Sequence, residues 1–147
     1  MPNKTQLTTA AQRVGNVHFE GLLRKEGVIR RGVGENYDDV LGFNYIAHEQ
    51  QGGCYEFYAA NPPLIGMTEP VPCPCPLGLE TFDEYRIDYK EAVRLFHSGN
   101  WGNMFTSITL SRPLVHPQTR EPFWHIRSNL GIDVVIGANS GEIHANT

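Results

Sequence analysis

Apolar and polar residues alternate in two aromatic-rich runs in the first half of the chain. The first run, residues 43–48, reads FNYIAH, and the second, residues 55–60, reads YEFYAA. Two glutamines and two glycines at residues 50–53 separate them. A glycine-containing loop between runs of period two predicts a β-hairpin in the N-terminal half.

The hydrophobic period changes to that of a helix later in the chain. Residues Asp88–Phe96 place four apolar residues on one side of a helix: Ala92, Val93, Leu95 and Phe96. Asp88 is suited to cap the first turn, with Glu91 three residues later, and Gly99 is suited to end the helix. The sequence predicts a helix here, with its apolar side against a sheet.

Three strand-like runs follow this helix. They cover residues Met104–Leu114, Glu121–Asn129 and Ile132–Ala138, and the turn signals between them are residues 116–119 and 130–131. A helix followed by three antiparallel strands is typical of an α+β domain in which the helix lies across one face of a meandering sheet.

The remaining segments have weaker patterns. Residues 1–16 read as a loose arm or a short helix around Thr8–Val14, and residues 17–39 fit a short helix no better than two short strands interrupted by glycines. Residues 62–76 hold most of the prolines, which exclude a helix or a central strand, so we interpret them as a connector between two halves. The length of 147 residues fits one domain.

The helix segment reads DYKEAVRLF, a later strand reads PFWHIRSN, and the end reads VVIGANSGEI. Together, from Asp88 to Ile143, they resemble the PepSY-type module, whose last strand ends in a vyvDAxTGev signature. The positions that match are Val135, Ala138, Ser140, Gly141, Glu142 and Ile143. Gly137 stands where the family has an acidic residue, and threonine is usual where Ser140 stands. The resemblance implies a cystatin-like fold, a helix packed on a curved antiparallel sheet, and modulation of a peptidase or another enzyme.

Composition narrows the function classes. The formal net charge is −4 and the sequence pI is about 5.8, which disfavours nucleic acid and anionic membranes as partners. No window approaches the roughly 18 apolar residues of a membrane span, and residues 1–16 contain no apolar leader. An odd number of cysteines, three, favours a reducing compartment, and we predict a cytoplasmic protein.

The sequence assigns no catalytic residue, metal ligand or cofactor. The short spacing of Cys73 and Cys75 does not fit a structural zinc site, so we predict that these residues and Cys54 are free thiols. His116, His125 and His144 would approach one another if the last strands are adjacent, but turn histidines are more often solvated. No nucleophile elbow and no HExxH motif is present.

Two functions remain open. The first is a non-enzymatic module that binds a protein or peptide, or forms a homodimer, through an exposed sheet edge at residues 132–138. The second is a small enzyme or ligand-binding protein with an aromatic pocket between helix and sheet. Trp101 either fills the edge of the core or anchors a partner. The candidate contacts for a ligand or partner are Tyr45, His48, Tyr55, Tyr58, Trp101, Trp124 and His125.

Overall fold

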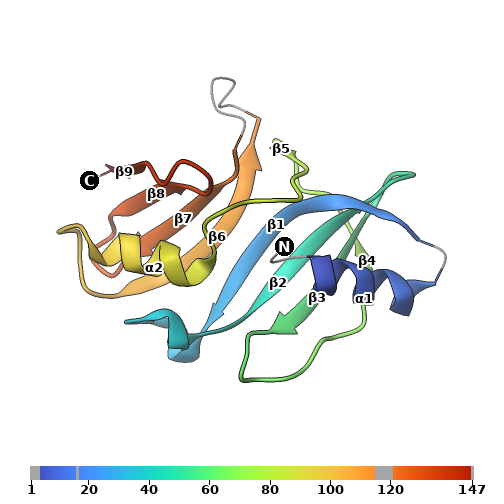
Figure 1. Cartoon of the computed structure of the whole chain (residues 1–147), viewed down its shortest axis with the longest axis horizontal. Coiled ribbons are helices and arrows are strands. Elements are labelled where there is room, and N and C mark those ends of the chain that lie inside the picture. The colour runs from blue at the N-terminus through green and yellow to red at the C-terminus, as the bar shows by residue number, and fades with distance from the viewer. Residues whose placement is uncertain (1–3, 16, 115–120, 147) are drawn as a thin grey trace.

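A computed structural model describes residues 4–15, 17–114 and 121–146. Nine strands form one antiparallel sheet in the order β4-β3-β2-β1-β6-β7-β8-β9, and β5 pairs with β6 beside this path (Figure 1). The elements are α1 (Lys4–Val14), β1 (Phe19–Ile29), η1 (Arg30–Gly32), η2 (Tyr37–Asp39), β2 (Val40–Glu49), β3 (Cys54–Ala60), β4 (Val71–Cys73), β5 (Leu79–Glu80), α2 (Tyr89–His97), β6 (Phe105–Pro113), β7 (Phe123–Ser128), β8 (Asp133–Gly137) and β9 (Ile143–Asn146).

The two halves of the chain repeat the same order of elements. In each half a helix precedes four strands of the main path, β1 to β4 after α1 and β6 to β9 after α2. The halves join where β1 pairs with β6, with Lys25 opposite Leu110. The expected cystatin-like helix on a curved sheet is wrong, because the described residues form a sheet of nine strands, which the N-terminal half extends, with two short α-helices.

The glycines of β1 are the reason why its sequence pattern is ambiguous. A Cβ atom on Gly27 would lie 2.5 Å from Cγ2 of Ile108, and a Cβ atom on Gly21 would lie 3.0 Å from the carbonyl oxygen of Phe82. These glycines do not break the strand; they let neighbouring segments approach it closely. β1 is a single strand of 11 residues near the centre of the sheet.

Both helices cover the same face of the sheet (Figure 1). Ala10 from α1 and Phe96 from α2 are fully buried in one core cluster with Phe43 and Trp124 from the strands. The opposite face carries a smaller cluster, which comprises Leu23, Ile46 and Cys54 with Cys73, Cys75 and Leu79 packed against it. Residues 4–14 of the expected loose arm are thus a helix that contributes to the core.

The helix predicted at Asp88–Phe96 is confirmed as α2. Asp88 is its N-cap and accepts a hydrogen bond from the backbone N–H of Glu91 at 3.0 Å. The Glu91 side chain does not complete a capping box; it accepts a hydrogen bond from Nε of Arg94 at 2.8 Å. Ala92, Val93 and Phe96 are buried, whereas Leu95 is only partly buried.

The predicted hairpin is confirmed as β2 and β3, and the three predicted C-terminal strands are confirmed as β6, β7 and β8. The turn expected at residues 116–119 lies outside the described residues. The expected edge at residues 132–138 is wrong, because β8 pairs with β9 through the turn after Ala138. The proline-rich segment forms β4 at the other end of the sheet, where Pro72 lies in an outer strand.

The expectation that all three cysteines are free thiols is wrong. Cys54 and Cys75 form a disulfide, and Cys73 is free. The pairing of β3 with β4 places Cys73 opposite Cys54 and Cys75 two residues beyond it. This proximity depends on a strand pairing across 21 residues of sequence, which local spacing does not indicate.

Within the described part of the chain, no helix is both long and apolar enough to cross a membrane.

Candidate functional site

Lys25 is the only buried charged residue among those whose exposure the structure describes, with 4% of its surface exposed. A shift in strand register between Leu22 and Arg24 inserts Leu23 as an extra residue. Leu22 packs in the helix-covered core, and Leu23 packs in the cluster on the opposite face. After this bulge the alternation resumes, and Lys25 points into the helix-covered core beside its partner on β2, Tyr45.

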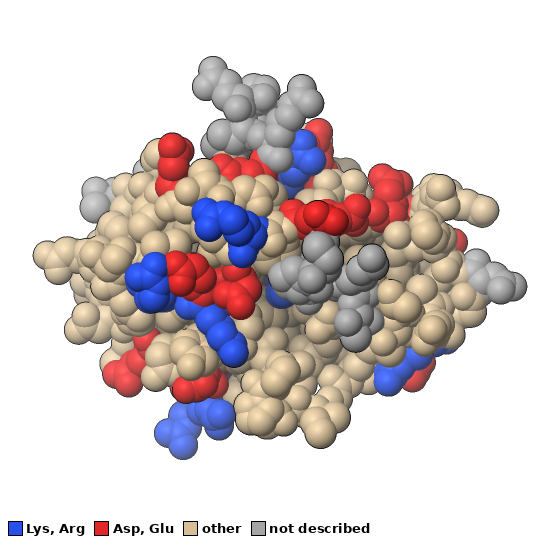
Figure 2. Space-filling model, viewed as in Figure 1, with Lys and Arg blue, Asp and Glu red and all other residues tan. Residues whose placement is uncertain are grey.

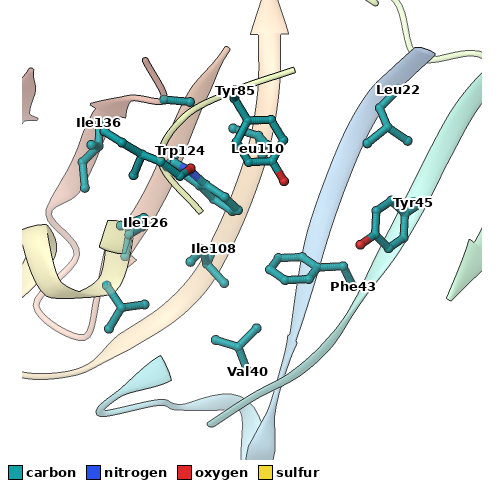
Figure 3. Packing of buried hydrophobic residues seen from close by; sticks show 14 of the residues in the cluster. Leu22, Val40, Phe43, Tyr45, Tyr85, Ile108, Leu110, Trp124, Ile126 and Ile136 are labelled. Atoms are coloured by element: carbon teal, nitrogen blue, oxygen red, sulfur yellow. The ribbon is translucent and has the colours of Figure 1, made fainter. Parts of the chain in front are cut away.

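Four aromatic rings surround the Lys25 amine; we call them the ring cage. The Nζ atom lies 4.5 Å from the ring centroid of Phe43, 5.2 Å from that of Tyr45, 5.6 Å from that of Tyr85 and 6.0 Å from that of Trp124. Figure 3 shows these four rings around one central space, into which the hydroxyl oxygens of Tyr45 and Tyr85 point. Rings at these distances attract a cation and also provide apolar walls.

The segment before α2 brings Tyr85 into the ring cage. Phe82 exchanges two backbone hydrogen bonds with Leu22 of β1, both 2.9 Å long. A few residues later, the backbone N–H of Ile87 donates to the carbonyl oxygen of Ala138 at 2.8 Å. The segment is therefore fixed at both ends, on β1 and on the turn after β8, and Tyr85 lies between these two attachments.

The turn in VVIGANSGEI contributes to this attachment. Asn139 accepts a hydrogen bond from the backbone N–H of Arg86 at 3.0 Å through its side chain. Its carbonyl oxygen accepts two more from the guanidinium of Arg86, at 3.0 and 2.7 Å. Gly141 has a φ of 76°, a left-handed conformation that glycine adopts without strain. This turn closes β8 onto β9 and holds the segment that carries Tyr85.

The cage rings fix one another. The Trp124 ring lies 6.0 Å from that of Phe43 and 6.1 Å from that of Tyr85, and its Nε1 donates a hydrogen bond to the carbonyl oxygen of Ile87 at 2.8 Å. On the other side, Tyr45 stacks on Phe57 at 5.1 Å. Each ring is thus held by a neighbour or a hydrogen bond, so the space around the amine has fixed walls.

Burial lowers the pKa of Lys25 to about 7, and the carboxylate of Asp88 opposes this shift. The amine is therefore divided between its charged and neutral forms near neutral pH. Its Nζ lies 2.9 Å from the hydroxyl oxygen of Tyr85. Burial raises the pKa of Tyr45, and Tyr89 adds to that shift, so the Tyr45 hydroxyl keeps its proton. A neutral amine in an apolar site is a nucleophile and a base, whereas the ammonium form binds the rings.

A hollow of about 370 Å³ lies between α1, the start of β1 and the segment before Tyr85, and no residue of the ring cage lines it. It is lined by Leu7, Thr8, His18, Phe19, Glu20, Asp83 and Glu84. A second hollow, of about 310 Å³, shares Leu7, Thr8, His18 and Phe19 with it, so the two adjoin along α1. Acidic and basic side chains are interspersed on this face of the molecule (Figure 2).

The structure brings together only two of the predicted contact residues, Tyr45 and Trp124. Tyr55 instead contacts the ring of Phe19 at 5.7 Å. His48 lies on the face opposite the helices, near Glu20, with 3.4 Å between its Nδ1 and a carboxylate oxygen. Tyr58, four residues after Cys54 on β3, also lies on that opposite face.

Trp101 and the histidines lie outside the ring cage. Nε1 of Trp101 donates to the carbonyl oxygen of Phe96 at 2.5 Å, and its ring packs against the core at the end of α2. His125 is only partly buried, between Trp124 and Ile126 on β7. His144 lies on β9, and His116 is outside the described residues. The described residues hold no group of three or more His, Cys, Asp or Glu side chains suited to a metal ion.

Sequence reasoning missed Lys25 and Tyr85. Without the bulge, the alternation that starts at Leu22 would point Lys25 away from the helix-covered core, so the sequence pattern does not mark Lys25 as buried. Tyr85 comes from an irregular segment whose place depends on backbone contacts with β1 and β8. Neither position carries a local signal in the sequence.

Comparisons of the chain with protein-family models and curated proteins, and of its fold with solved structures, found no match. The resemblance to the PepSY-type module therefore stays a prediction.

Proposed function

We propose that this protein binds a small, largely apolar organic molecule on the helix-covered face, with the Lys25 amine as its polar contact. The observation that carries the proposal is the burial of that amine among four fixed aromatic rings. A methionine would fill a similar volume without the free-energy cost of removing an amine from water. A buried titratable group with a shifted pKa inside apolar walls is typical of a binding or active site.

The ligand class follows from the walls and the polar groups of the cage. Aromatic rings favour an aromatic or flat apolar ligand, and the amine together with the Tyr85 hydroxyl favours one hydrogen-bonding oxygen on it. The hollow along α1 supplies space next to the segment that carries Tyr85. This proposal takes up the predicted ligand-binding function with a different set of residues, because Tyr45 and Trp124 are the only two of the predicted contact residues that line the cage.

The two tryptophans give a matched pair of probes for this function. Trp124 is part of the cage, whereas Trp101 contacts the end of α2. In a ¹H–¹⁵N spectrum, benzyl alcohol at increasing concentration should shift the indole signal of Trp124 to saturation and leave that of Trp101 unchanged. Equal shifts of both signals, or no saturable shift of Trp124 by any member of a panel of small apolar alcohols and ketones, would contradict the proposal.

A protein- or peptide-binding module is the second candidate, and β9 favours it. β9 is the last strand of the sheet path in the described residues, so one of its edges has no strand beside it there. The other end of the path is β4, where Pro72 removes a backbone donor. An open edge binds a peptide or a second copy of the chain by strand addition. Modulation of a peptidase, which the PepSY resemblance implies, belongs to this candidate.

The molecular mass of the protein in solution tests whether it self-associates through the edge of β9. If β9 pairs with a second copy, the wild type is a dimer at tens of micromolar, and Ala145→Pro in β9 is a monomer. A monomeric wild type would reject the homodimer, and a dimer that persists in Ala145→Pro would place the contact elsewhere.

The compartment is also a proposal. The odd cysteine count predicts the cytoplasm, whereas the Cys54–Cys75 disulfide favours an oxidising compartment. We therefore propose that the chain works where disulfides persist. Alkylation of the native protein in its cells, followed by mass spectrometry, should label Cys73 alone; labelling of all three cysteines would favour the cytoplasm.

A further inference from the structure

We propose that Lys25 forms an imine with the aldehyde or ketone group of a small apolar ligand, and that the Tyr85 hydroxyl transfers the proton for this reaction. This inference rests on the ligand-binding function proposed above and names its substrate class. It assigns two residues that sequence patterns do not mark, one from β1 and one from the segment before α2.

The geometry supports a covalent role for the amine. Nζ lies inside four rings, the nearest of which is Phe43 at 4.5 Å, so these rings would be the apolar walls around the body of a carbonyl compound that reaches the amine. Burial of the amine also keeps bulk water away from a newly formed imine and disfavours its hydrolysis. The hydroxyl oxygen of Tyr85 lies 2.9 Å from Nζ, within reach of an oxygen on the carbon that the amine attacks.

The reaction balances without an oxidant or a cofactor. The neutral amine attacks the carbonyl carbon, and a proton moves from nitrogen to oxygen to give a carbinolamine. The Tyr85 hydroxyl then protonates the carbinolamine oxygen, which leaves as water while the nitrogen lone pair forms the C=N bond. The resulting iminium returns a proton to the Tyr85 oxygen, so the products are a neutral imine, one water molecule and an unchanged tyrosine.

The charge state of the amine agrees with this geometry. The pKa of Lys25 is about 7, so a large fraction is neutral at physiological pH. The groups that face the amine are the Tyr45 hydroxyl from β2, the Tyr85 hydroxyl, and the carboxylate of Asp88 at the start of α2, with the rings of Phe43 and Trp124 completing the walls. The carboxylate of Asp88 and the faces of the rings favour the charged form, whereas burial favours the neutral form and lowers the pKa.

Benzaldehyde with cyanoborohydride tests the imine, because reduction converts it to a stable benzyl amine. The chain has three lysines, and Lys90 is exposed, which makes it the internal control. At neutral pH, peptide mapping should show benzylation of Lys25 at a rate at least about tenfold above that of Lys90. Tyr85→Phe keeps the ring and removes the hydroxyl, and should slow labelling of Lys25 by about tenfold.

Benzyl alcohol separates this inference from the function on which it rests, because it has the same ring but cannot form an imine. If benzyl alcohol shifts Trp124 while Lys25 is labelled no faster than Lys90, the imine is wrong and ligand binding stands. If Lys25 is labelled preferentially while no member of the panel of alcohols and ketones shifts the Trp124 signal, the imine stands and non-covalent binding is wrong. Tyr85→Phe labelled at the wild-type rate, with its Trp124 shift by benzyl alcohol intact, would remove Tyr85 from the mechanism.

Discussion

The Lys25 amine lies 2.9 Å from the Tyr85 hydroxyl oxygen, although 60 residues separate the two in the chain. β1 supplies the lysine at the junction of the two halves of the sheet, and a segment attached to both halves supplies the tyrosine. The site therefore forms only when both halves are folded and joined. This dependence connects the architecture of the sheet to the proposed function.

Lys25 should make stability increase with pH above neutrality. Its pKa is about 7 in the folded chain against an ordinary value of 10.5, so between these values the unfolded chain binds more protons. The free energy of unfolding then rises with pH through this window, by about 2 kcal/mol from about pH 7 to about pH 9. Urea denaturation at several pH values measures this change.

Lys25→Met is the matched variant for that experiment, because it fills the cage without a titrating group. In this variant the free energy of unfolding should not rise with pH above neutrality. Below neutral pH the variant should be more stable than the wild type by about 1–4 kcal/mol. If the free energy of unfolding changes with pH in the same way in both proteins, Lys25 is not buried as the structure describes.

The helix α2 should depend on Phe96 more than on Leu95. Phe96 is fully buried in the core, whereas Leu95 is only partly buried. Phe96→Ala should lower the free energy of unfolding by about 3–5 kcal/mol, and Leu95→Ala by clearly less. Chemical denaturation of both variants checks this order, and equal losses would contradict the orientation of the helix.

The disulfide should stabilise the chain by about 2–4 kcal/mol, because it closes a long loop between β3 and the segment after β4. Cys75→Ser should lose this free energy, and reduction of the wild type should have a similar effect. Cys73→Ser is the control and should stay close to the wild type, since Cys73 is free. A large loss in Cys73→Ser with none in Cys75→Ser would show that the pairing is wrong.

Gly27 should tolerate no side chain while Ile108 is present. A Cβ atom there would lie 2.5 Å from Cγ2 of Ile108, and overpacking of this kind costs about 1–3 kcal/mol. Ile108→Ala removes the clashing group. The double variant Gly27→Ala with Ile108→Ala should therefore lose less free energy of unfolding than the sum of the losses in the two single variants. Additive losses in a double-mutant cycle would contradict the close approach of β1 and β6.

Segments with strong local signals could be predicted from the sequence. The Asp88 cap and the apolar side of α2 lie within nine residues, and the β2–β3 hairpin carries both its alternation and its glycine turn. β1 could not be predicted, because its glycines serve contacts with Ile108 and Phe82, which are remote in sequence.

The candidate site was harder to predict, because it too depends on contacts between segments that are remote in sequence. Tyr45 and Trp124 stand out as large aromatic residues in strands, and both line the cage. Lys25 reads as an ordinary surface residue, since only the bulge at Leu23 turns it toward the core. The disulfide and the position of Tyr85 likewise depend on contacts between remote segments.

The most direct test of the central claim is the titration of the Lys25 side chain itself. With ¹³C- and ¹⁵N-labelled lysine, NMR signals of the three lysine side chains can be followed with pH and assigned through Lys25→Met. Burial in the ring cage predicts that Lys25 titrates with a midpoint of about 7. A midpoint near the ordinary lysine value of 10.5 would contradict the buried amine and, with it, the proposed ligand site.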